Sequence, residues 1–229
     1  MKPLRSKRSR AFTLLELLVV MGMVAALSFV FVGALGGGKG AALESGQALM
    51  ANYLIATRTK SMTTGQSARL LINVEVAGTA QPARYLRYVV LQVHVDGVWQ
   101  TTSDAYLPAG VFVLPGNFSV LPAGLFPNAS GPWTKSDGSN LRSTALRANN
   151  IVFAMINGEN IEQWASVSLA AAGTTASSGD LIVGSGRIRA PGSYGAGESP
   201  VELEHPDQVR GLSLSTYGVA TLINRRESF

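Results

Sequence analysis

Residues 10–35, RAFTLLELLVVMGMVAALSFVFVGAL, decide how the chain is organised, because they combine a long apolar run with a single acidic residue. The nineteen residues from 17 to 35 carry no charge. As an α-helix they would span about 28 Å, which is close to the hydrocarbon thickness of a bilayer. We therefore expect a long N-terminal hydrophobic α-helix over residues 12–35 that crosses a membrane.

The residues before this run are strongly basic. The chain has 19 basic and 14 acidic residues, and the first eleven positions hold five of the basic ones and no acidic one. These five are Lys2, Arg5, Lys7, Arg8 and Arg10. The positive-inside rule places this end in the cytoplasm and everything after the apolar run on the far side. The rest of the chain is formally neutral, so we expect no nucleic-acid binding through the folded domain.

A secretory signal peptide also joins a basic end to an apolar stretch, but it is cut after that stretch at small residues. Ala34 could mimic such a site. Against this interpretation, the apolar run is longer than is usual for a signal peptide, and Glu16 lies near its start. A carboxylate in such a segment is costly, so something should compensate its charge.

Residues 10–20, RAFTLLELLVV, resemble the processing and methylation motif of type IV prepilins and type II secretion pseudopilins. In that family a membrane aspartyl peptidase cuts before the aromatic residue and methylates the new N-terminus. The resemblance implies cleavage between Ala11 and Phe12, N-methylation of Phe12, and retention of the apolar segment. Ala11 stands where the family usually has glycine, so small size is kept at this position.

Glu16 would be the fifth residue of the processed chain. It matches the family's glutamate, which is thought to pair with the N-terminal amine of a neighbouring subunit. An α-amino group has an ordinary pKa near 8 and stays cationic at neutral pH. A buried carboxylate facing that amine replaces two unpaired charges with one pair. The resemblance therefore gives Glu16 a role in assembly.

Residues 36–62 are expected to form a glycine-rich joint followed by an amphipathic stem. Four of the five residues from 36 to 40 are glycine, which weakens a helix. The run from Gly33 to Lys39 begins like a phosphate-binding loop, but Gly40 follows where a Ser or Thr would have to bind magnesium. We therefore reject a nucleotide-binding site here. From residue 41 apolar residues recur at helical spacing, and Leu49, Tyr53 and Ala56 are candidates for the buried face.

Residues 63–229 are predicted to form a mainly antiparallel β domain outside the cytoplasm, which makes the expected fold class α+β. Candidate strands cover 68–76, 84–95, 98–101, 110–114, 151–156, 166–170, 180–189 and 211–223. Asp96 and Gly97 separate two of them and predict a two-residue hairpin turn. Residues 115–150 are rich in Pro, Gly, Ser and Asn, so we expect a long excursion from the sheet there.

The order of these parts also resembles the H-type minor pseudopilins and the related FimT-like minor pilins. The features that carry this likeness are residues 54–62 ahead of a strand, residues 151–153 ahead of Asn157 and Gly158, and a late strand at 218–220. The likeness covers most of the chain through loose patterns, whereas the leader motif covers about twenty residues and is specific.

Catalytic and metal-binding patterns are sparse. The chain has no cysteine, and its two histidines do not show metal-ligand spacing. Glu202, Glu204 and Asp207, together with Glu198, could supply oxygen ligands to calcium, but a solvated acidic loop explains them better, so we expect no metal site. We expect no cofactor and no enzymatic activity.

Two functions fit these patterns. The first is a structural subunit, of the minor kind, of a type IV pilus or type II secretion pseudopilus in the inner membrane. Its partners would be prepilin peptidase, other pilin or pseudopilin subunits, the inner-membrane assembly platform and membrane lipid. The alternative is a membrane-anchored extracytoplasmic binding module that does not polymerise. Glu16 distinguishes the two, because a simple anchor has no use for a carboxylate there.

Overall fold

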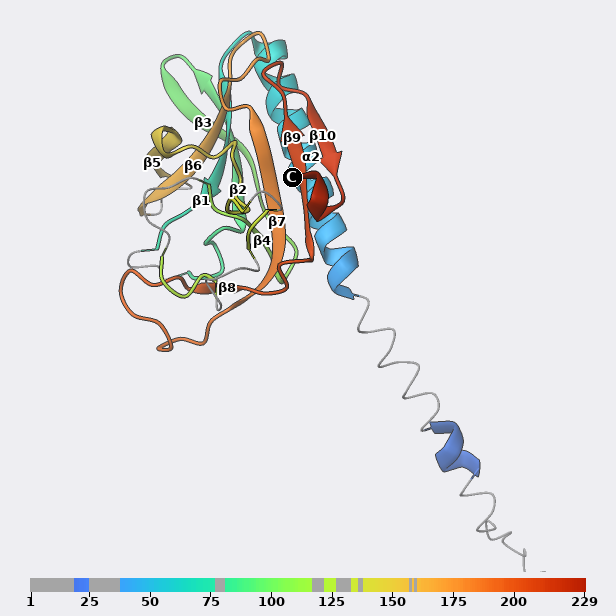
Figure 1. The fold of residues 1–229 in the computed structure, drawn as a ribbon. Coiled ribbons are helices and arrows are strands. Elements are labelled where there is room, and N and C mark those ends of the chain that lie inside the picture. The colour runs from blue at the N-terminus through green and yellow to red at the C-terminus, as the bar shows by residue number, and fades with distance from the viewer. Residues whose placement is uncertain are drawn as a thin grey trace, which may run out of the picture. The chain divides into compact units, whose positions relative to one another are not determined.

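The computed structural model of this chain describes residues 19–24, 38–76, 81–116, 122–126, 133–135, 138–156, 158 and 160–229 (Figure 1). The chain divides into two compact units, Met1–Gly38 and Lys39–Phe229. The predicted leader, residues 1–11, and most of the segment predicted as helix over residues 12–35 lie outside the described residues.

The helices differ from the prediction. In the first unit, residues 19–24 are helical. The long described helix is α2 (Gly38–Thr64), which lies after the apolar run and carries charged residues such as Glu44 and Arg58. Within the described part of the chain, none of the helices is both long and apolar enough to cross a bilayer. The expected fold class is therefore wrong in its first element, the long hydrophobic helix over residues 12–35.

Five strands form one sheet, called sheet A here, in which all neighbours are antiparallel. Across the sheet they are β3 (Val98–Tyr106), β2 (Tyr88–Val95), β1 (Ala68–Asn73), β6 (Ile161–Leu169) and β5 (Ile151–Met155). The short 3-10 helix η1 (Ala148–Asn150) precedes β5. All six residues of the central strand β1 are buried, because Leu70 joins the main core on one face and Leu71 joins a second cluster with Trp164 on the other.

The remaining strands form sheet B, which is also antiparallel. Its order is β10 (Ala220–Ile223), β9 (Val209–Leu214), β7 (Gly179–Ile188) and β4 (Val111–Val113), and β8 (Val201–Leu203) pairs with β7. A second 3-10 helix, η2 (Arg226–Ser228), follows β10. Because β4 belongs to sheet B and β5 to sheet A, the excursion between them connects the two sheets.

Local turn chemistry explains where β2 begins and ends. Asp96 and Gly97 both have positive φ angles, 50° and 82°, so the predicted hairpin between β2 and β3 is confirmed. The strand predicted from residue 84 begins later, at Tyr88, because residues 82–87 form turns and Leu86 has a φ of 56°. Leu86 donates its N–H to the carbonyl of Asn73 and accepts from Val113 N, which links the two sheets.

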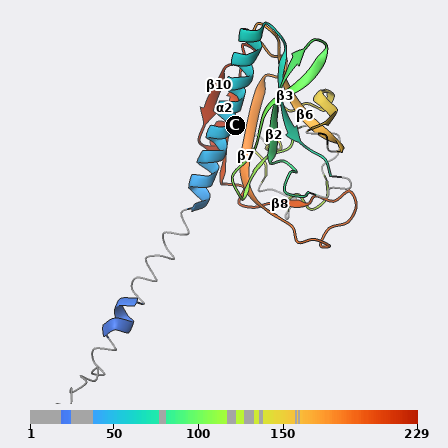
Figure 2. The same cartoon turned by 180° about the vertical axis from the view of Figure 1, so that it is seen from behind.

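One large hydrophobic core joins α2 to both sheets. The helix contributes Leu43, Met50 and Leu54, each at most 3% exposed. Seen from opposite sides, Figures 1 and 2 show α2 lying along β9 and β10 of sheet B. Burial of apolar side chains from three layers in one core fixes this helix to the domain.

Candidate functional site

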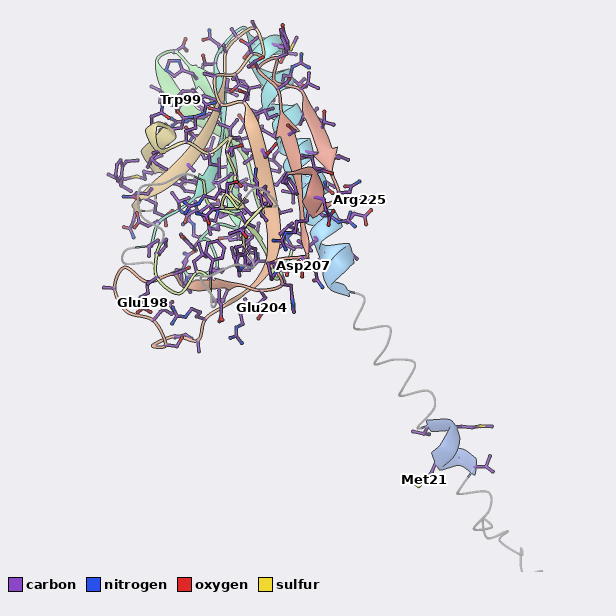
Figure 3. The ribbon with its side chains drawn as sticks, viewed as in Figure 1. Met21, Trp99, Glu198, Glu204, Asp207 and Arg225 are labelled. Carbon is purple, nitrogen blue, oxygen red and sulfur yellow. The ribbon has the colours of Figure 1, made fainter. Side chains whose placement is uncertain are left out.

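The residues predicted for processing and assembly, Ala11, Phe12 and Glu16, lie outside the described residues. In the part of the apolar run that the structure describes, the side chains expose between 46% and 67% of their surface. These side chains belong to Val19, Val20, Met21, Met23 and Val24, and Figure 3 labels Met21. The proposed processing and assembly roles therefore stay predictions.

The attachment of α2 to sheet B is the most specific polar contact that the helix makes. Gln47 is 3% exposed, and its Nε2 donates to the carbonyl of Gly211 at 2.7 Å and to that of Ile223 at 3.0 Å. Gly211 and Ile223 are partners in the β9–β10 ladder. One buried amide thus connects the helix to the backbone of two strands. An apolar side chain in its place would remove a hydrogen bond from each of the two carbonyls.

Glycines allow the helix to approach its neighbours closely at two places. A Cβ on Gly46 would lie 2.7 Å from Val111 Cγ1 in β4. Gly218, in the turn before β10, lies near Arg58 of α2. A Cβ on Gly218 would lie 2.1 Å from the Gly173 carbonyl oxygen and 3.3 Å from Cδ of Arg58. At both positions a larger residue would have to displace its neighbours, so this close packing requires glycine.

The buried face of α2 agrees in part with the expected one. Leu49 and Tyr53 are half-buried and pack against the main core, but Ala56 is exposed, whereas Thr57 and Ser61 are fully buried. The two hydroxyls donate to backbone carbonyls of their own helix, Thr57 to Tyr53 O at 2.6 Å and Ser61 to Arg58 O at 2.8 Å. Because buried hydroxyl side chains share the packed face with Leu43, Met50 and Leu54, apolar periodicity alone locates only part of it.

The opposite face of α2 is open and built largely of small side chains. Ile55 and Met62 are 57% and 52% exposed. The other exposed positions between residues 41 and 60 are Ala41, Glu44, Ser45, Ala48, Asn52, Ala56, Thr59 and Lys60. A surface of this kind lets another element approach the helix backbone closely.

The carboxylates considered for calcium contact arginines, and Figure 3 labels three of them, Glu198, Glu204 and Asp207. Arg187 lies 2.7 Å from Glu202 and 3.4 Å from Glu204, and the hydrogen bonds that it donates to the Glu202 carboxylate raise the pKa of Arg187. Asp207 is hydrogen-bonded by Arg226. Among the described residues, no three His, Asp or Glu side chains are grouped so that they could hold a metal ion.

Sequence reasoning missed a cluster of aromatic and charged side chains on the face of sheet A that points away from α2. Tyr88 and Tyr106 stack with ring centroids 4.6 Å apart, and the Arg84 guanidinium lies 4.5 Å above the Tyr88 ring. The Tyr88 hydroxyl donates to Asp104 at 2.9 Å. Burial, followed by the contact with Asp104, raises the pKa of Tyr88. The two-residue period of β2 puts Tyr88 on the same face of the strand as Gln92, and this period is the sequence pattern that could have indicated the cluster.

A second cation–π contact lies on the same face. The Arg69 guanidinium lies 4.0 Å above the ring of Trp99 and donates twice to Gln92 Oε1, at 3.0 and 2.8 Å. Desolvation lowers the pKa of Arg69 to about 10. These cation–π contacts and hydrogen bonds stabilise the outer face of sheet A.

Comparison with known proteins adds the following. No protein-family model matches the sequence, and no curated protein matches it. Two solved structures of the minor pseudopilin EpsH from the type II secretion system of Vibrio cholerae are similar to this chain, each with 14% sequence identity over 82% of it. One match covers 99% of the pseudopilin chain with a TM-score of 0.39, and the other covers 98% with a TM-score of 0.38.

Proposed function

We propose that this chain is a structural subunit, of the minor kind, of a type IV pilus or type II secretion pseudopilus. The observation that carries the proposal is the motif at residues 10–20, in which Glu16 is the first acidic residue of the chain and precedes nineteen uncharged ones. In this account prepilin peptidase cuts between Ala11 and Phe12 and methylates Phe12. The processed chain then keeps its apolar segment.

The apolar segment and its basic leader support a place in the inner membrane. Five positive charges before the segment hold the leader in the cytoplasm, and the β-rich domain lies on the other side. There the chain would meet the assembly platform and other pilin or pseudopilin subunits. Its contribution is mechanical and architectural, so we propose no catalytic role.

Glu16 supplies the driving contact of assembly. A carboxylate in an apolar environment is expensive unless a cation faces it. The N-terminal amine of a neighbouring subunit, created by cleavage before Phe12, is such a cation. Pairing stabilises the assembled form relative to the single subunit in the lipid, because both charges are otherwise unpaired there.

The contacts of α2 suit a subunit that is moved from its N-terminal side. Gln47 binds sheet B through two backbone carbonyls, and Leu43, Met50 and Leu54 of the helix pack into the main core. A load applied at the start of α2 therefore reaches the strands through buried contacts. The open face of the helix, with Ile55 exposed, is available to a neighbouring subunit.

The experiment is incorporation of Glu16 variants into filaments in a strain that has the matching assembly machinery. Glu16→Ala and Glu16→Gln should reduce incorporation strongly while the protein stays in the membrane fraction. Asp96→Asn is the matched control, because Asp96 is an exposed carboxylate in the turn between β2 and β3 and does not belong to the open face of α2. Normal incorporation of both Glu16 variants would favour the alternative, a membrane-anchored module that does not polymerise.

A further inference from the structure

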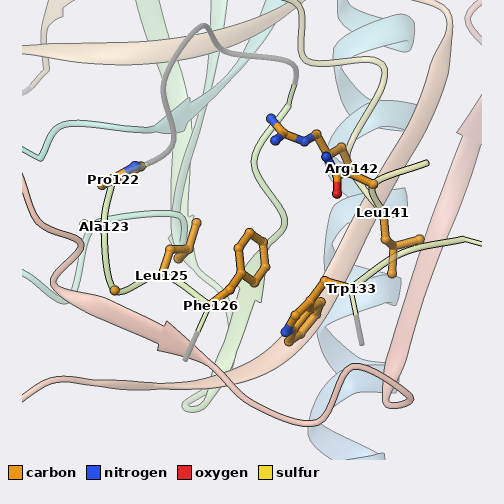
Figure 4. Close-up of a pocket in the computed structure, with 9 residues that line it drawn as sticks. Pro122, Ala123, Leu125, Phe126, Trp133, Leu141 and Arg142 are labelled. Carbon is orange, nitrogen blue, oxygen red and sulfur yellow. The ribbon is translucent and has the colours of Figure 1, made fainter. Parts of the chain in front are cut away.

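The excursion between β4 and β5 encloses a pocket of about 300 Å³. Its walls come from residues 122–126 on one side and from residues 133 and 140–142 on the other (Figure 4). The lining residues are Pro122, Ala123, Gly124, Leu125, Phe126, Trp133, Asn140, Leu141 and Arg142. A volume of this size is at the lower end for small-molecule sites, so it suits a group about as large as one amino-acid residue.

Apolar and aromatic side chains form the wall of the pocket. Phe126 and Trp133 have ring centroids 4.9 Å apart with planes tilted by 44°. Trp133 is 7% exposed, and Leu125 and Leu141 are each 1% exposed. This wall would bury an aliphatic or aromatic group and gain from aromatic contacts as well as from burial.

Backbone hydrogen bonds hold the two walls in place without a ligand. Leu125 O accepts from Leu203 N of β8 at 2.8 Å, and Ala123 O accepts from Ser199 N at 2.9 Å. On the other side Leu141 N donates to Trp133 O at 2.8 Å. The pocket is therefore formed in advance, and a ligand does not have to order its walls.

Arg142 gives the pocket a positive charge, and no carboxylate of the described residues forms an ion pair with it. It is half-buried, and among the described residues its guanidinium donates only to the carbonyl of Gly116, at 3.3 Å. Figure 4 shows the side chain extending across the pocket toward the side of Pro122. A guanidinium has five N–H donors, so most of those of Arg142 remain for a ligand. A carboxylate matches them in charge and can accept two parallel hydrogen bonds.

We propose that this pocket binds the carboxyl-terminal residue of a partner polypeptide whose last side chain is apolar or aromatic. The terminal carboxylate pairs with Arg142, and the side chain lies against Phe126 and Trp133. Asn140, which is exposed at the rim, offers an amide to the peptide bond before the last residue. The rest of the partner leaves through this open side.

The test uses the full-length protein in detergent micelles and the peptide N-acetyl-Gly-Phe as a free acid. Isothermal titration compares it with the same peptide as a C-terminal amide and with N-acetyl-Gly-Gly, which lacks the ring. The free acid should bind at least about tenfold more tightly than either, because only the acid offers both the carboxylate and the ring. Equal affinity for acid and amide, or no binding of the acid, would overturn the proposal.

Two arginine variants and a control separate the pocket from other surfaces. Arg142→Gln should abolish the preference for the acid over the amide, and Arg142→Lys should keep part of it because the charge remains. Arg147→Gln is the control, since Arg147 is an exposed arginine of the same segment that donates to Ser178 O. An unchanged preference in Arg142→Gln would refute the assignment, whatever the outcome for the Glu16 variants.

Discussion

Replacing Gln47 by leucine should loosen α2 from the domain at a defined cost. Gln47 Nε2 donates to Gly211 O and Ile223 O, and the side chain is 3% exposed. Two neutral hydrogen bonds contribute about 1 kcal/mol each, and leaving a buried carbonyl unsatisfied costs about another 1–3 kcal/mol. Leucine has a similar volume, so no cavity term is added. We expect the free energy of unfolding to fall by about 3 to 5 kcal/mol.

Urea unfolding of the full-length protein in mild detergent, followed by tryptophan fluorescence, measures this loss. Asn52→Leu is the matched control, because Asn52 is an exposed amide on the same helix. It should change the free energy of unfolding by less than about 0.5 kcal/mol. A similarly small effect of Gln47→Leu would show that the amide does not fasten the helix to sheet B.

Three further changes test other parts of the domain by the same unfolding measurement. Gly218→Ala should lower the free energy of unfolding by about 3 kcal/mol, because φ is +70° and the new Cβ would meet a backbone carbonyl at 2.1 Å. Gly138→Ala is its control and should lower it by only about 1 kcal/mol, because φ is +80° but nothing lies within 4 Å. Glu162→Gln should lower the free energy of unfolding by about 3 kcal/mol, because it removes the carboxylate 3.2 Å from the buried guanidinium of Arg84. An unchanged free energy of unfolding would mean that this ion pair does not stabilise the fold. Burial raises the pKa of the Tyr85 hydroxyl above its ordinary value of 10.0, so above this pH the folded chain keeps a proton that the unfolded chain loses, and stability should fall as the pH rises beyond about 10. Tyr85→Phe should make this fall shallower, and an unchanged slope would contradict the assignment.

Local patterns predicted the elements that local chemistry controls. The Asp96–Gly97 turn could be predicted because both positions adopt positive φ, which few residue pairs tolerate. The excursion after residue 115 could also be expected from its Pro and Gly content. In contrast, the pairing of β1 with β6 joins residues about a hundred positions apart, and no periodicity encodes that partner.

The helices show why the fold class was wrong. The apolar run between residues 17 and 35 dominated the pattern, yet the long described helix begins at Gly38. Its packed face includes Gln47 and Thr57, whose burial depends on carbonyls that a sequence pattern cannot place. The pocket could not be predicted from the sequence either, because a backbone hydrogen bond between residues 133 and 141 brings Trp133 and Arg142 to the same pocket.

The mass of the protein purified from membranes tests the central claim most directly. Mass spectrometry of the intact chain and of its N-terminal peptide should show a chain that starts at Phe12, lacks residues 1–11 and carries one methyl group on its N-terminus. Glu16 would then be its fifth residue. A chain that still begins with Met1, or one cut near Ala34 with the apolar segment removed, would contradict the account.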